Sequence, residues 1–325
     1  MKYHERHKTR RTVGRLPLFP SPYPGESIYS LLCRYHVRSG NVNDWYTIGQ
    51  LFGYNSSLGS TLLSPYHLEK ARAWIGPGAS ISTETLLQKN TAFPLFSLTA
   101  DEYDISRIFD MISGKMESTT FPRWVQTRLV HSSGRLRYCP ECAASQEKLY
   151  GEAYWQVLPQ IDGVEYCPVH GVRIKNTTIP LKDVRHKFYP ASYVMKTMSR
   201  ADQDNDDNRP EVFSLDRETF VRLAQGLDWL HRNGFRYKGL KRLNRCYNRI
   251  LGRSDDRYWP AINQNELRKH FSENHQSEGS YRYLISKVSS VMYDGTIFLY
   301  CIPLCAHVMI MNAVSGNPQD FYALS

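Results

Sequence analysis

The chain has 325 residues, of which 41% are hydrophobic and 22% are charged, and its formal net charge is +10. This length predicts about two domains, and the hydrophobic fraction is high enough to bury real cores, which excludes a wholly disordered chain. The basic N-terminus has no apolar leader behind it and the seven cysteines are an odd number, so we expect a cytoplasmic protein with free or metal-bound thiols, not a secreted disulfide scaffold.

The first predicted segment is a basic arm at residues 1–15, which holds six Lys and Arg side chains and one Glu. Prolines at positions 17, 20, 22 and 24 then favour an extended strap, because proline fixes φ and restricts the residue before it. Unpaired charges are costly to bury, so we expect residues 1–24 to reach a partner instead of packing in a core. A solvated tail is the alternative. The candidate contact residues in the arm are Lys8, Arg10, Arg11 and Arg15.

Apolar residues at helical spacing predict a helical domain over residues 25–136. Short turns separate the first three of its helices, which is compatible with a helix-turn-helix-like unit, although any small helical domain gives a similar pattern. The predicted helices span residues 26–38, 43–52, 65–74, 84–89, 101–111 and 123–130.

A block rich in cysteine, proline and glycine follows at residues 137–175. The next segment, residues 176–210, is predicted to be a connector. It ends in an acidic linker at 201–210, where Asp and Asn cluster before a proline and apolar side chains are almost absent.

Residues 211–325 are predicted to form a second helical, basic, DNA-binding domain, so the expected fold class is mainly α. One apolar stripe is formed by Phe220, Leu223, Leu227 and Leu230, and another by Leu240, Leu243, Tyr247 and Ile250. A shorter helix is expected at 264–270. The apolar run 297–311 is about 15 residues long, which is too short to span a membrane, and we expect it to be buried core.

The second concentration of positive charge falls in this domain. Residues 231–257 hold nine Lys and Arg side chains and two Asp, and this excess indicates a nucleic-acid partner. Four of these cations share a helix face opposite the leucine stripe, because the spacings between them are four, three and four residues. They are Lys238, Arg242, Arg245 and Arg249. A solvated helix face whose arginines pair with acids elsewhere is the alternative. The candidate nucleic-acid-binding residues are Arg236, Lys238, Lys241, Arg242, Arg245 and Arg249.

The most specific pattern is a pair of short motifs, Cys139 and Cys142 and then, after 24 intervening residues, Cys167 and His170. Two ligand pairs, each spaced by two residues, are typical of a tetrahedral zinc site. Four protein ligands leave no open coordination position, so the sequence predicts a structural Zn²⁺. Four unrelated side chains are the alternative, which the paired spacing disfavours.

Nothing in the sequence predicts an enzyme. A phosphate-binding GxxxxGK[ST] motif and a GxSxG motif are both absent.

Several segments resemble the TniQ/TnsD family. The segment PYPGESIYS at 22–30 is similar to that family's opening motif, and TAFPLF at 91–96 to its T-FPL segment. The segments at 137–142, 150–156 and 166–171 resemble its zinc-finger block in order and spacing. The resemblance covers residues 16–175 and continues more loosely through 220–275.

This resemblance implies a TniQ domain with an embedded zinc finger, and target-site selection for a bacterial cut-and-paste transposon. The favoured interpretation is a TnsD-like protein that binds the target DNA and recruits the AAA+ ATPase TnsC, which engages the transposase. The first alternative is a TniQ-like adaptor that links a CRISPR RNA-guided effector complex (Cascade) to TnsC, with little DNA binding of its own. A nuclease that uses the cysteine block is a third possibility, which the closed ligand set disfavours.

Overall fold

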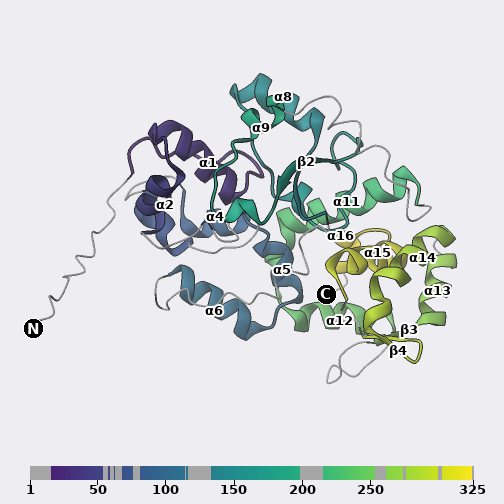
Figure 1. The fold of residues 1–325 in the computed structure, drawn as a ribbon. Helices are drawn as coiled ribbons and strands as arrows, with labels where there is room; N and C mark the ends of the chain where they lie inside the picture. The colour runs from purple at the N-terminus through teal and green to yellow at the C-terminus, as the bar shows by residue number, and fades with distance from the viewer. Residues whose placement is uncertain are drawn as a thin grey trace, which may run out of the picture.

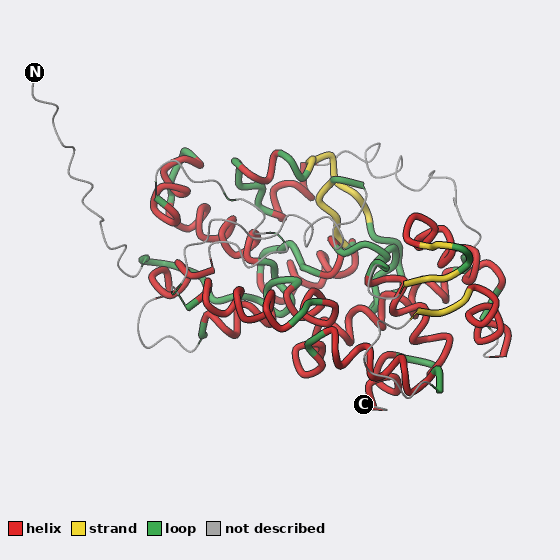
Figure 2. Tube along the Cα trace, turned by 90° about the horizontal axis from the view of Figure 1, so that it is seen from below, coloured by secondary structure: helices red, strands yellow, loops and turns green. Residues whose placement is uncertain are grey.

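The computed structural model in Figure 1 describes residues 16–53, 58, 62, 68–75, 81–113, 115, 133–197, 215–252, 261–273, 276–298 and 302–323. Helices make up most of these residues, which confirms the mainly α fold class. The strands form two small antiparallel sheets, which lie apart from one another in Figure 2. No helix in these ranges is long and apolar enough to cross a membrane.

The N-terminal part is a set of short helices and one 3-10 turn. They are α1 (Ile28–Ser39), α2 (Asp44–Phe52), η1 (Leu68–Lys70), α3 (Ala71–Ile75), α4 (Thr83–Lys89), α5 (Phe93–Thr99) and α6 (Glu102–Ile112). Polar caps explain where α1 and α2 begin, since the side chains of Ser27 and Asn43 accept hydrogen bonds from backbone N–H groups of the first turn. Four of the predicted helices match these elements to within two residues. In the predicted helix 65–74, the described part begins with the 3-10 turn, and the predicted helix 123–130 lies outside the described residues.

The cysteine-rich block contains β1 (Arg135–Tyr138), α8 (Pro140–Tyr150), η2 (Leu158–Gln160), β2 (Lys175–Pro180), η3 (Asp183–Arg185) and α9 (Ala191–Thr197). Strands β1 and β2 pair antiparallel, with Arg137 opposite Asn176 and Tyr138 opposite Lys175. This pairing begins before position 137 and continues past position 175, so the structural unit around the cysteines is wider at both ends than the predicted block.

The C-terminal part starts at α11 (Arg217–Asn233), and the predicted linker 201–210 lies outside the residues that the structure describes. The elements that follow are η4 (Gly234–Tyr237), α12 (Leu240–Ile250), β3 (Ala261–Asn263), α13 (Gln264–Glu273), α14 (Glu278–Val288), η5 (Ser289–Val291), β4 (Met292–Tyr293), β5 (Thr296–Phe298), α15 (Leu304–Ser315) and α16 (Pro318–Ala323). Strand β5 is the centre of the second sheet, between β3 and β4. The apolar run 297–311 therefore divides into a strand and the buried helix α15.

Helix α11 lies in the middle of the molecule and joins the two halves (Figure 1). It packs on α5 as well as on α15 and α16, and Leu223, Leu227 and Leu230 are fully buried. Gly226 allows α11 to approach α15 closely, because a Cβ atom there would lie 2.6 Å from Cγ1 of Val308. The helix pattern predicted for this segment is confirmed, and its buried face connects the N-terminal and C-terminal helices in one core.

The strap is the clearest difference from the sequence prediction. The prediction that residues 1–24 would avoid the core is wrong for residues 16–24, which pack on the helical body. Leu16 is buried and its N–H donates to the Trp74 carbonyl at 3.2 Å, while the Tyr23 ring stacks on Tyr150 at 4.2 Å. The physical reason is that the strap carries aromatic and aliphatic side chains between its prolines, and their burial is favourable. The basic arm with Lys8, Arg10, Arg11 and Arg15 lies outside the described residues.

A candidate metal centre and a basic groove

The first two metal-ligand candidates lie at the start of α8. Cys139 is the N-cap residue of this helix, and its Sγ accepts the N–H of Cys142 at 3.4 Å. Pro140 occupies the first turn, where its fixed φ suits a helix and its missing N–H is not needed. The cap therefore places the two cysteine side chains on the same side of the helix end.

The other two candidates lie in a tight hairpin between residues 165 and 174. The Cys167 N–H donates to the Val172 carbonyl and the Ile174 N–H to the Glu165 carbonyl, both at 2.8 Å. Gly171 closes the turn with φ +61°, a left-handed conformation that glycine adopts without strain. This turn brings Cys167 and His170 to face the end of α8.

The four side chains form one cluster whose ligand atoms all lie within 4.8 Å of one another. His170 Nδ1 is 3.6, 3.4 and 3.5 Å from the sulfurs of Cys139, Cys142 and Cys167, and the last two sulfurs are 3.7 Å apart. A tetrahedron with metal–sulfur bonds of about 2.3 Å and metal–nitrogen bonds of about 2.0–2.1 Å has S–S edges of about 3.8 Å and S–N edges of about 3.6 Å. The predicted ligand set is thus confirmed as a site that can hold a metal ion.

The three thiols of the cluster act on one another. Cys139 and Cys167 are buried, and hydrogen bonds from the other two thiols lower the pKa of the Cys167 thiol, whereas the hydrogen bonds to Cys167 and burial raise the pKa of Cys139 and Cys142. A thiol that loses its proton readily is the better ligand, because the thiolate is the form that binds metal. Since all four corners of the tetrahedron are protein side chains, the centre can connect α8 to the hairpin but offers no position for a substrate.

A buried arginine contacts the base of the 165–174 hairpin. Arg137 on β1 is 1% exposed, forms an ion pair with Glu165 at 2.9 Å and donates to the Pro159 carbonyl at 3.0 Å. Its own backbone N–H donates to the Gln160 side chain at 3.0 Å. These contacts join β1, η2 and the hairpin directly beside the metal ligands. Sequence reasoning missed this residue, because an arginine next to a cysteine motif carries no signal that it is buried.

The predicted nucleic-acid helix is α12, and its apolar side is buried as expected. Leu240, Leu243 and Tyr247 are at most 9% exposed, and Lys241, Arg245 and Arg249 are exposed on other sides. One detail of the prediction is wrong: the helix begins at Leu240, so Lys238 precedes it. Gly239 interrupts the regular backbone there with φ +105°.

Two of the six basic candidates make contacts within their own segment. The Lys238 Nζ lies 4.2 Å from the centre of the Phe235 ring. Arg242 is half-buried, donates to the Arg236 carbonyl at 3.1 Å and lies over the Tyr237 ring at 4.9 Å. These contacts hold the two cations close to the turn between α11 and α12.

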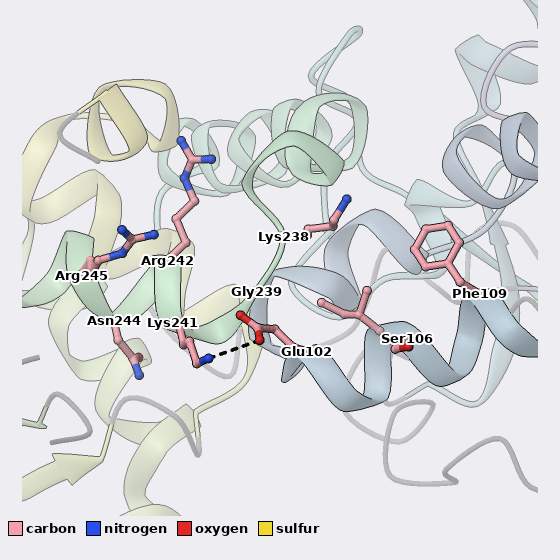
Figure 3. A pocket seen from close by; sticks show the side chains of 10 residues that line it. Glu102, Ser106, Phe109, Lys238, Gly239, Lys241, Arg242, Asn244 and Arg245 are labelled. Carbon is pink, nitrogen blue, oxygen red and sulfur yellow. Dashed lines mark hydrogen bonds and ion pairs between the residues drawn. The ribbon is translucent and has the colours of Figure 1, made fainter. Parts of the chain in front are cut away.

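A groove of about 830 Å³ separates α12 from α6 (Figure 3). It brings together four of the six predicted cations and leaves Arg236 and Arg249 outside its lining. It also includes Glu102, which forms an ion pair with Lys241 at 3.2 Å across 139 sequence positions, and which sequence reasoning missed. The lining residues are Glu102, Ile105, Ser106, Phe109, Lys238, Gly239, Lys241, Arg242, Asn244 and Arg245.

Comparisons with known proteins agree with the earlier resemblance. Residues 17–174 match the family model described as TniQ. The chain is also 29% identical over 172 residues to the transposon Tn7 transposition protein TnsD of Escherichia coli. The matched stretch covers 53% of this chain and 34% of that relative, so it spans about a third of the length of TnsD. All four metal-ligand residues lie inside the family match, whereas α12 lies outside it.

Proposed function

Because residues 17–174 match the TniQ family, we propose that this chain selects target sites for transposition by binding the target DNA and recruiting a TnsC-type AAA+ ATPase. The DNA-binding part of this proposal is supported above all by the basic groove beside α12. A duplex is a polyanion, and clustered cations on one exposed helix are the surface that it requires.

The metal in the Cys₃His cluster is proposed to be Zn²⁺ with a structural role. The donor set and the spacing of its atoms suit zinc, and zinc bound there would supply a cross-link between α8 and the 165–174 hairpin. In this proposal the protein is not an enzyme, because its own four ligands fill the coordination sphere.

Helix α12 is proposed to lie along the DNA backbone. Its 11 residues rise about 16 Å, which is enough to follow several phosphates. Lys241, Arg245 and Arg249 are exposed along it, with Lys238 beside its start. If four phosphate contacts form, the affinity should fall with salt at a log–log slope of about −3.6, from roughly −0.9 for each phosphate.

One observation favours the adaptor as a second candidate. The family match contains the metal centre but ends before α12, so the matched part could act without a DNA-binding helix. In that case the chain would link a Cascade complex to TnsC, and the cations of α12 would serve solubility or protein contact.

Fluorescence anisotropy with a labelled random-sequence duplex tests the DNA-binding proposal. The parent protein should bind with a steep salt dependence, and the variant Lys241→Ala, Arg245→Ala, Arg249→Ala should lose most of its affinity. A matched control is Arg268→Ala, Lys269→Ala, Arg282→Ala, which removes three exposed cations from α13 and α14 outside the groove. Equal binding by the triple variant and the parent would refute a role for α12. Binding of the ATPase or a guide complex by a parent protein that does not bind DNA would favour the adaptor.

A further inference from the structure

The α6–α12 groove contains an acid where a DNA-binding surface would be expected to hold only cations and neutral groups. Of the ten residues that line it, four are basic and one, Glu102, is acidic. The Glu102 Oε2 lies 3.2 Å from the Lys241 Nζ, as the dashed line in Figure 3 shows, and both side chains are more than 70% exposed. The carboxylate therefore occupies the position that a phosphate oxygen would take on this lysine.

The backbone places these two side chains opposite each other. The Gly239 N–H donates to the Ser97 carbonyl at 2.7 Å, and the Leu240 N–H donates to the Ala100 carbonyl at 2.9 Å. These bonds attach the start of α12 to the end of α5 and to the turn that leads into α6. Lys241 is the next residue of α12 and Glu102 is the first residue of α6, so the fold itself sets their separation.

We propose that Glu102 limits the electrostatic affinity of this surface for nucleic acid, because it competes with DNA phosphates for Lys241 and so weakens sequence-independent binding. The inference rests on the proposed DNA-binding function. Phosphate contacts carry no sequence information directly, so a penalty on one of them lowers the affinity that every duplex shares. An exposed ion pair suits this role, because it is weak enough to be exchanged when the remaining contacts are favourable.

The magnitude follows from counterion release. If the loss of the Glu102 charge frees Lys241 for one additional phosphate, the log–log salt slope should become steeper by about 0.9. If the two proteins bind DNA equally at 1 M salt, this change of slope makes the protein without the Glu102 charge bind about 8-fold more tightly at 0.1 M.

A double-mutant cycle tests the proposal by anisotropy on a random-sequence duplex of about 30 base pairs across a salt series. The proteins are the parent, Glu102→Gln, Lys241→Gln and the double variant. Glu278→Gln is the matched control, because it removes the same charge from an exposed ion pair, with Arg268 at 3.0 Å, outside the groove. We expect Glu102→Gln to bind more tightly with the steeper slope, and the double variant to bind like Lys241→Gln.

The outcomes separate this inference from the proposed function. If the parent binds DNA but Glu102→Gln gains no more than Glu278→Gln, the inference is wrong and the DNA-binding proposal stands. The inference is also wrong if Glu102→Gln raises the affinity as much in the Lys241→Gln protein as in the parent, because the acid would then act without that lysine. If no variant binds DNA, the proposed function fails and the inference fails with it.

Discussion

His307 provides a pH-dependent test of the C-terminal core. This residue of α15 is fully buried, and its Nδ1 is 2.9 Å from the hydroxyl of Tyr247 on α12. Its Nε2 has no hydrogen-bond partner among the described residues. Burial lowers the pKa of His307 to about 3, because removal from water disfavours the charged ring.

The sign of the effect follows from the two states. Between the unfolded pKa of about 6.5 and the folded value, the unfolded chain binds the proton that the folded chain excludes, so stability falls as the pH decreases through this interval. From pH 7 to pH 5 the loss should be about 2 kcal/mol. For a chain of this length that corresponds to a decrease in melting temperature of about 3 °C.

The perturbation is His307→Gln, which does not titrate and can still accept a hydrogen bond from Tyr247. The free energy of unfolding would be measured by urea denaturation at pH 7 and pH 5. Burial raises the pKa of Glu26 to about 7, which gives a trend of the opposite sign, so only the difference between the parent and the variant is diagnostic. That difference should change by about 2 kcal/mol between the two pH values. A constant difference would refute the reasoning.

Three further predictions concern other parts of the chain. Elemental analysis of the folded protein should find about one zinc per chain, and Cys142→Ser should lose it while Cys33→Ala, at a buried cysteine outside the cluster, retains it. Deletion of residues 1–15 should leave the melting temperature unchanged and weaken ATPase recruitment in a pull-down. Loss of soluble protein would instead show that the arm is structural. Gly226→Ala should destabilise the protein by about 1–3 kcal/mol in urea denaturation, because the new methyl group would collide with Val308. Arg222→Ala on the exposed side of α11 should be nearly neutral, and a stabilised Gly226→Ala would contradict the described packing.

The local patterns of the sequence were sufficient for the metal centre and for most helices. Two ligand pairs at short spacing specify a tetrahedral cluster whatever path the chain between them takes. The four ligands therefore follow from the sequence. Helix α12 follows from its apolar stripe, because a period of 3.6 residues places Leu243 and Tyr247 on one face. Helix α5 was missed for the converse reason: nearly all its residues are buried, so it shows no alternation between polar and apolar sides.

The contacts between distant segments depended on the tertiary structure. The proline content of the strap indicated an extended chain, but only the fold brings Tyr23 onto Tyr150 and buries Leu16. The buried Arg137 side chain is paired with Glu165 and donates to the Pro159 carbonyl, and neither partner can be inferred from neighbouring residues. The groove depends in the same way on backbone bonds that place Glu102 opposite Lys241. Periodicity and ligand spacing report forces that act within one turn or one short motif, whereas these pairs are determined by how separate elements pack, which no local pattern encodes.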